Sequence, residues 1–183
     1  MASEWDKNFS FGPFAKTLDF VLAENSTIYI CTSWHLAGAI WRWMSIRSSY
    51  SGYCVWNKTN PMPSLAKRHW TWASELICYA TFGKHTFNFP DEGHAPIVWA
   101  LTKHKETDHP TEKPVEVPSH AIIHSSTAGD IVFDGFAGSG TTLVACQNLS
   151  RRGRAIEISP AYCAVILERM IMAFPDIDIY KVE

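Results

Sequence analysis

The fold is decided by the stretch Asp130-Ile131-Val132-Phe133-Asp134-Gly135-Phe136-Ala137-Gly138-Ser139-Gly140-Thr141-Thr142. Its first five residues predict a buried strand, its glycines predict a tight turn, and Thr141–Ser150 predicts a helix. A second strand is predicted at Arg154–Ile158 and a second helix at Pro160–Ala173. Alternation of strands and helices is typical of a parallel sheet wound by right-handed crossovers, so the sequence predicts an α/β fold.

The chain before this unit also predicts both helices and strands. Helical spacing of apolar residues predicts two helices, and β-branched runs bounded by turn residues predict four strands. The helices are expected at Phe14–Ala23 and His35–Ile46, and the strands at Thr27–Thr32, Tyr53–Trp56, Glu75–Thr81 and Ala95–Leu101. A charged, proline-rich segment predicts a hinge loop over 103–118. We therefore expect one domain over 1–183, with one half before the loop (1–102) and one after it (119–183).

Composition limits the kind of protein this is. Hydrophobic residues make up 46% and charged residues 19%, as in a folded globular domain. A net charge of −2 argues against strong non-specific nucleic-acid binding, so any DNA contact must come from a local patch. The five cysteines are scattered, which favours reduced, buried thiols over a disulfide framework. No apolar run approaches the ~20 residues that span a bilayer, and the start lacks signal-peptide features, so we expect a cytoplasmic protein away from membranes.

The glycine turn at 135–140 leaves several ligand classes open. Its backbone N–H groups stand at the positive end of a helix, where an anionic or polar ligand is stabilised. The Gly135-x-x-x-x-Gly140 spacing matches a phosphate-binding loop, but Thr141 stands where that loop needs lysine. The Gly-x-Gly-x-x-Gly dinucleotide fingerprint does not fit either. Asp134 and Glu157 follow the two strands, and acids there favour a ribose-bearing ligand with a cationic amino-acid tail.

Residues 133–142 resemble the cofactor motif of the N6-adenine and N4-cytosine DNA methyltransferases. Upstream, His109–Pro114 looks like the Lys-Pro segment that precedes this motif in the subgroup whose cofactor half comes last. Other segments similar to that family are 56–61, 75–77, 153–158 and 162–169. The resemblance covers nearly the whole chain.

The resemblance implies a Rossmann-like methyltransferase fold, with a doubly wound, mostly parallel sheet, and S-adenosyl-L-methionine as cofactor. It also implies an enzyme that methylates an amino group of double-stranded DNA in a restriction–modification setting, with adenine N6 expected over cytosine N4. Residues 119–183 would be the cofactor-binding half, and 1–102 the remnant of the target-base half. The cofactor contacts that it implies are Thr111, Lys113, Asp134, Phe136, Gly138, Ser139, Gly140, Thr141 and Glu157.

The alternatives for these residues are structural. Phe136 is alternatively a core residue, Lys113 a solvated cation and Glu157 a charge at a strand end. The ordered set as a whole favours the cofactor interpretation.

The family's catalytic string, Asp/Asn/Ser-Pro-Pro-aromatic, does not occur in these 183 residues. In the subgroup that this chain resembles, it precedes a segment similar to Ser3–Asp6. The nearest string is Asn60-Pro61-Met62-Pro63, which lacks the paired prolines and the aromatic ring, so Asn60 is only a remote catalytic candidate. We therefore expect a truncated or degenerate methyltransferase whose sheet lacks one strand. The alternative is a non-catalytic, cofactor-binding or dimerising domain that modulates a partner.

Two further predictions concern partners. A basic and aromatic patch for weak DNA binding is expected from Lys58, Lys67, Arg68 and His69, with Trp70 and Trp72 beside them; the alternative is a solvated loop next to core tryptophans. An exposed sheet edge would favour a homo-oligomer. His120 and His124 have helical spacing but no evident acidic or cysteine partner, so no metal site is predicted.

Overall fold

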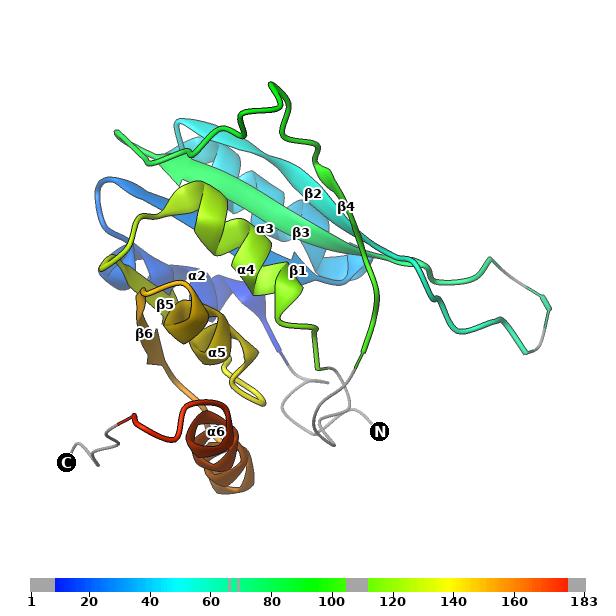
Figure 1. The fold of residues 1–183 in the computed structure, drawn as a ribbon. Coiled ribbons are helices and arrows are strands. Elements are labelled where there is room, and N and C mark those ends of the chain that lie inside the picture. Colours follow the sequence, from blue (N-terminus) through cyan, green and yellow to red (C-terminus); the bar gives the residue numbers. More distant parts are fainter. Residues whose placement is uncertain (1–8, 66, 69, 105–111, 178–183) are drawn as a thin grey trace. The chain divides into compact units, whose positions relative to one another are not determined.

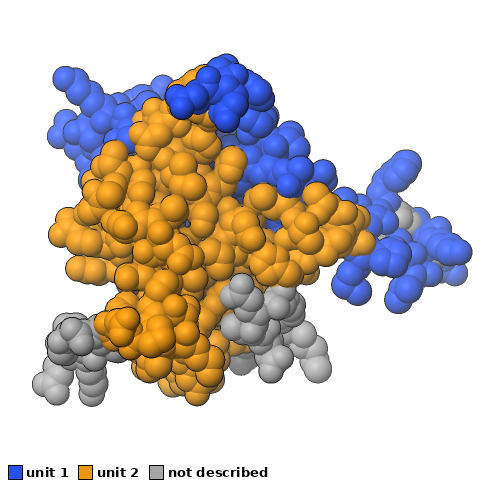
Figure 2. All heavy atoms as spheres, in the orientation of Figure 1, with its two compact units in different colours: residues 1–57, 62–86, 91–100 blue, residues 58–61, 87–90, 101–183 orange. Residues whose placement is uncertain are grey.

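The computed structural model describes residues 9–65, 67–68, 70–104 and 112–177. These residues alternate helices and strands, which confirms the predicted α/β class. They form two compact units (Figure 2), one over 1–57, 62–86 and 91–100 and the other over 58–61, 87–90 and 101–183. Within the described part of the chain, no helix has the length and apolar character needed to cross a membrane.

The first unit holds most of a four-stranded sheet with the order β1-β3-β2-β4 (Figure 1). Strand β3 is antiparallel to both of its neighbours, so β1 and β2 run in the same direction and β3 alone opposes them among these three. The amide of Val55 donates to the carbonyl of Ile97 at 2.8 Å, which holds the segment before β4 beside β2. The elements are α2 (Phe11–Val21), β1 (Ser26–Thr32), α3 (Trp34–Arg47), β2 (Tyr50–Lys58), β3 (Ser74–Phe82) and β4 (Val98–Leu101).

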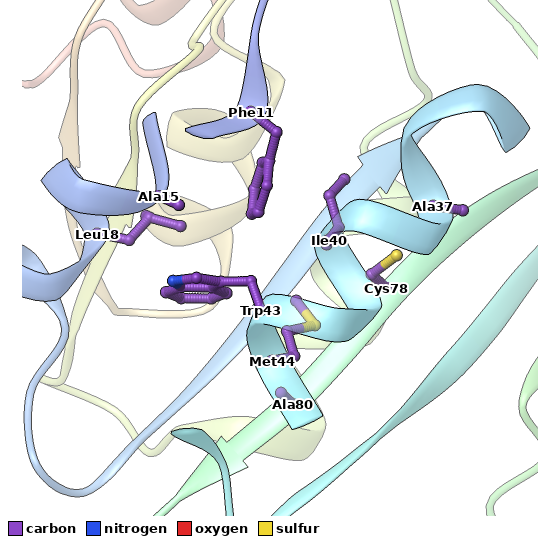
Figure 3. Close-up of a cluster of buried hydrophobic side chains, with 9 residues drawn as sticks. All are labelled: Phe11, Ala15, Leu18, Ala37, Ile40, Trp43, Met44, Cys78 and Ala80. Carbon is purple, nitrogen blue, oxygen red and sulfur yellow. The ribbon is translucent and has the colours of Figure 1, made fainter. Parts of the chain in front are cut away.

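The core of the first unit lies between α2, α3 and β3 (Figure 3). Buried residues recur at helical spacing on both helices, so each helix turns one apolar stripe inward. The Phe11 ring meets Trp43 edge-on, with ring centroids 5.9 Å apart. The buried members are Phe11, Ala15, Leu18, Ala37, Ile40, Trp43, Met44, Cys78 and Ala80.

The second unit contains α4 (Glu116–Ser125), β5 (Ile131–Asp134), α5 (Thr141–Asn148), β6 (Arg152–Ala155) and α6 (Pro160–Ala173). Strands β5 and β6 pair in parallel, from Ile131 opposite Arg152 to Asp134 opposite Ala155, as the strand–helix–strand pattern predicts. A small apolar core packs α4 against α5 through Ile122, Ala145 and Cys146.

Most boundaries differ from the sequence prediction by a few residues, and three of these differences have a local cause. Helix α4 begins inside the predicted hinge loop, because Pro118 occupies its third position, where a backbone N–H needs no partner within the helix. Most of the rest of that loop, residues 105–111, lies outside the described residues. Strand β6 ends at Ala155 and not at Ile158, because its neighbour β5 ends at Asp134. Helix α5 ends at Asn148, and the left-handed Ser150 (φ 59°) follows it.

Arg151 joins the C-terminal ends of two helices in the second unit. Its guanidinium donates to the carbonyls of Leu149 and Ser126, both at 2.6 Å, and to the Ser126 hydroxyl at 3.0 Å. Helix C-termini present unpaired carbonyls and partial negative charge, so one cation satisfies the ends of both α4 and α5.

All five cysteines are free, but the predicted burial holds for only three of them, because Cys31 is exposed and Cys163 is half-buried. Cys54, Cys78 and Cys146 are buried, and burial raises the pKa of each of these thiols to about 11. They remain protonated near neutral pH and behave as small apolar side chains.

Candidate cofactor site

The glycine turn between β5 and α5 has a backbone that only glycine adopts readily. Gly138 and Gly140 have φ angles of +54° and +78°. Gly140 is the N-cap of α5, and its amide donates to the Ala137 carbonyl at 2.8 Å. A Cβ atom on Gly140 would lie 3.0 Å from Cγ1 of Ile166 in α6. Glycine adopts these backbone angles without strain, and the contact with α6 leaves no room for a side chain at Gly140, so both features fix the shape of the turn.

The two predicted acids hold this turn from both sides. The Asp134 carboxylate accepts the amide of Phe136 at 2.9 Å. The two oxygens of Glu157 accept the amides of Gly138 and Ser159, both at 2.8 Å. A carboxylate oxygen has a second lone pair, so each acid keeps acceptor capacity for a ligand while it positions the turn.

Apolar side chains lie exposed in the segments that leave the two strands. Phe136 is 50% exposed, which argues against the alternative that it fills a core. Ile156 and Ile158, on either side of Glu157, are also exposed. The amide of Ala137 donates to the Ile156 carbonyl at 3.0 Å, so the two segments are adjacent. Carboxylates beside exposed apolar surface suit a ligand with both a hydroxylated part and a flat ring.

The hydroxyl groups of Ser139 and Thr141 face into the protein. Both residues are buried, and Nη1 of Arg169 in α6 lies 3.3 Å from the Ser139 hydroxyl and 3.0 Å from the Thr141 hydroxyl. The Thr141 hydroxyl in turn reaches the Lys113 carbonyl at 3.3 Å. The hydroxyls of these two predicted contacts are therefore engaged by Arg169 and the Lys-Pro segment.

The Lys-Pro segment lies against the start of α5. The bond from Thr141 to the Lys113 carbonyl fixes its place, and Pro114 is fully buried. Lys113 is half-buried, unlike a freely solvated loop cation. Thr111 lies outside the described residues.

Two residues at this site were not predicted. Glu112 and Arg169 form an ion pair of 3.0 Å whose side chains are 1% and 9% exposed. Both lie in segments that the family resemblance covers, but nothing in the spacing of the sequence pairs them.

The predicted DNA-binding residues fall in different places. Lys67 and Arg68 lie in the loop between β2 and β3, which reaches well past the ends of these strands (Figure 1). Trp70 and Trp72 are 94% and 69% exposed, so the interpretation of them as core tryptophans is wrong. Lys58 ends β2 and is assigned to the second unit, and His69 lies outside the described residues.

Asn60 pairs with the backbone of Lys103. Its side-chain amide donates to the Lys103 carbonyl at 2.8 Å and accepts the Lys103 amide at 2.7 Å. Both polar atoms are used in this pairing, which favours a structural role over the catalytic one.

His120 and His124 have ring centroids 4.9 Å apart on α4. The His124 Nδ1 atom lies 2.8 Å from the carbonyl of Asn88, and its ring stacks on Phe87. Burial, and secondarily the charge of His124, lowers the pKa of His120. In the part of the chain that the structure describes, no three His, Cys, Asp or Glu side chains gather as metal ligands would.

This chain is similar to known proteins in both sequence and structure. A model of a DNA methylase family matches residues 2–168. The chain is 29% identical to the type II methyltransferase M2.DpnII of Streptococcus pneumoniae, over 91% of this chain and 71% of that protein. It is 30% identical to the type II methyltransferase M2.MboI of Moraxella bovis, over 84% and 64% of the two chains. The crystal structure of the M1.HpyAVI–SAM complex matches with a TM-score of 0.80 and 28% identity, over 90% of this chain and 84% of that one.

Proposed function

Since the chain belongs to the DNA methylase family, whose members use S-adenosylmethionine, we propose that the glycine turn with Asp134 and Glu157 binds this cofactor for methylation of a DNA amino group. The observation that carries the proposal is that two carboxylates, those of Asp134 and Glu157, accept hydrogen bonds from the same glycine turn. Both follow parallel strands at the same edge of β5–β6, and both bond backbone amides of the turn. Ligands of open α/β sheets bind at this edge.

The residues present fit the parts of the cofactor. Glu157 and the exposed Ile158 suit the ribose hydroxyls and the purine ring. Asp134 and the open backbone at Gly138 suit the charged methionine end, with Phe136 beside it. The bound cofactor supplies an electrophilic methyl group, and the protein's part here is to orient it and to exclude water.

Titration calorimetry with S-adenosylmethionine tests this site. Loss of one charge-assisted hydrogen bond costs about 1.5–3 kcal/mol, so Glu157→Ala should weaken binding roughly ten- to a hundredfold. Glu168→Gln, at an exposed position of α6, is the matched control and should bind like the wild type. A well-folded wild-type protein that binds no cofactor at millimolar concentration would overturn the proposal.

We further propose that binding and methyl transfer are separable in these 183 residues. The sequence contains no paired prolines, and Asn60 is bonded to Lys103, so among the residues that the structure describes we find no group placed to accept the amine hydrogens of a flipped base. Radiolabel incorporation into unmethylated DNA should stay at background. Incorporation above control that Asp134→Ala abolishes would show instead that a substitute site acts, and nucleoside digestion would then distinguish adenine N6, which we predict, from cytosine N4.

The loop between β2 and β3 is the proposed DNA contact. Lys67 and Arg68 supply cations, and the exposed rings of Trp70 and Trp72 suit stacking on unpaired bases. A double Lys67→Ala/Arg68→Ala variant should bind DNA more weakly and lose about 2 from the slope of log affinity against log salt. Lys16→Ala, an exposed cation on α2, is the control. Equal slopes for both variants would remove this loop from the interface.

The alternative function is that of a non-catalytic domain that binds the cofactor and modulates a partner. We expect the protein to act in the cytoplasm under both proposals. Ile131 and Phe133 are exposed on one face of β5, while the other face packs on α5. We propose that a second copy covers this face in a homo-oligomer. Light scattering should therefore show more than one chain per particle at tens of micromolar, and a strict monomer would contradict it.

A further inference from the structure

One nitrogen atom of Arg169 connects the Lys-Pro segment with the glycine turn and the helix start that follows it, two regions distant in sequence from each other and from Arg169. Nη1 lies 3.0 Å from Glu112 Oε1, 3.2 Å from the Ser139 carbonyl and 3.0 Å from the Thr141 hydroxyl. Glu112 belongs to the Lys-Pro segment, Ser139 to the glycine turn, and Thr141 to the first turn of α5. We call Glu112, Ser139, Thr141 and Arg169 the Arg169 network.

The network is almost closed to solvent. The Glu112 and Arg169 side chains are 1% and 9% exposed, and Ser139 and Thr141 are buried. Charges inside a protein interact strongly with one another, and a buried ion pair tolerates little change in geometry. The network therefore fixes the distance between the Lys-Pro segment and the glycine turn.

The same face of α6 also fixes the turn sterically. Ile166 lies one helical turn before Arg169 and is the residue that a Cβ atom on Gly140 would meet. Residues three apart on a helix share a face. Helix α6 thus holds the turn by an apolar contact at Gly140 and by polar contacts at Ser139 and Thr141.

We infer that Arg169 is a positioning residue for cofactor binding. Arg169 does not touch S-adenosylmethionine, but it holds the glycine turn and the Lys-Pro segment in the arrangement that binds this cofactor. This inference rests on the proposed cofactor site. The Arg169 network fixes the orientation of the backbone amides of the turn. Disrupting the network should therefore lower the affinity for the cofactor even in a variant that still folds.

The decisive variant is the pair Glu112→Gln/Arg169→Met. Removing Arg169 alone would leave the Glu112 charge buried and unpaired, which is strongly destabilising, whereas neutralising both partners avoids that penalty. We expect the pair variant to melt close to the wild type and to bind S-adenosylmethionine about tenfold more weakly in calorimetry, as expected for loss of charge-assisted bonds.

Arg169→Lys distinguishes positioning from simple filling of space. Nη1 makes each of the network contacts named above, and a lysine ammonium presents three donors from a single nitrogen at the end of its stem. Cofactor affinity should therefore return to within about threefold of the wild type, a difference below ~1 kcal/mol. Glu168→Gln on the same helix is the control for a charge change next to Arg169.

A folded pair variant with wild-type affinity would overturn the inference. If the pair variant does not fold, Thr141→Val decides, because it removes one hydroxyl of the network and leaves both buried charges paired. About a threefold loss of affinity is expected, below ~1 kcal/mol, and an unchanged affinity would contradict us. Wild-type protein that binds no cofactor would overturn the proposed function itself. If Glu157→Ala weakens cofactor binding while the variants of the Arg169 network bind like the wild type, this inference is overturned and the proposed function is not.

Discussion

The core of the first unit and the glycine turn of the second unit are built by different forces. The buried members around Trp43, where α2, α3 and β3 meet, are all apolar, and the Arg47 guanidinium lies over the Trp43 ring, 5.3 Å from its centroid. Around Gly138 the contacts are hydrogen bonds, which Asp134 and Glu157 accept from the turn and Arg169 donates to it. Apolar packing depends on volume and tolerates exchange of similar residues, whereas a polar arrangement depends on the position of single atoms. The first region should therefore govern stability, and the second should govern ligand binding.

The largest test of this difference is Trp43→Ala. Truncation of a buried Trp leaves a cavity and should lower the free energy of unfolding by about 3–5 kcal/mol. Chemical denaturation measures this loss, and cofactor affinity measured well below the transition should stay near the wild-type value. Trp72→Ala, which removes an exposed ring from the same unit, should change stability by only about 0.5 kcal/mol. Similar losses for both variants would mean that burial does not control stability here.

An intermediate effect is expected for Gly140→Ala. The left-handed backbone costs a non-glycine residue about 1–2 kcal/mol, and contact with Ile166 adds to it. Gly129→Ala is the matched control, because Gly129 has φ +85° and nothing within 4 Å of its added Cβ. We expect Gly140→Ala to lose more stability than Gly129→Ala and also to weaken cofactor binding. If Gly129→Ala alone weakened the binding, the turn would not be the site.

The smallest effect concerns pH. Burial lowers the pKa of His120 below its ordinary value of 6.5, so between the two values the unfolded chain binds more protons than the folded one. Stability should therefore be full above pH 6.5 and decline as the pH falls through the folded-state pKa. Denaturation at several pH values should show a shallower decline for His120→Gln than for the wild type. His94→Gln, in the first unit, controls for loss of one imidazole, and a parallel decline for all three proteins would contradict this assignment.

How far the sequence predicts this molecule differs between the same two regions. Apolar spacing located α3 and β3 to within a residue or two, because burial of one face leaves a periodic pattern. The glycine turn and its two acids were also recognised in order. Helix α4 was only partly anticipated, since Pro118 reads as a helix breaker unless its place in the first turn is known. The Glu112–Arg169 pair could not be read from spacing, because it joins residues 57 positions apart whose meeting depends on the tertiary fold.

Arg151 has a consequence for handling the protein. Its guanidinium donates hydrogen bonds of 2.6–3.0 Å to carbonyl and hydroxyl oxygens at the ends of α4 and α5, and salt weakens such part-buried bonds far less than it weakens exposed ion pairs. Contacts to DNA phosphates, by contrast, weaken steeply as salt rises. Concentrated salt should therefore strip nucleic acid from the purified protein while the junction of these two helices stays intact, which allows cofactor titrations on material free of copurified DNA.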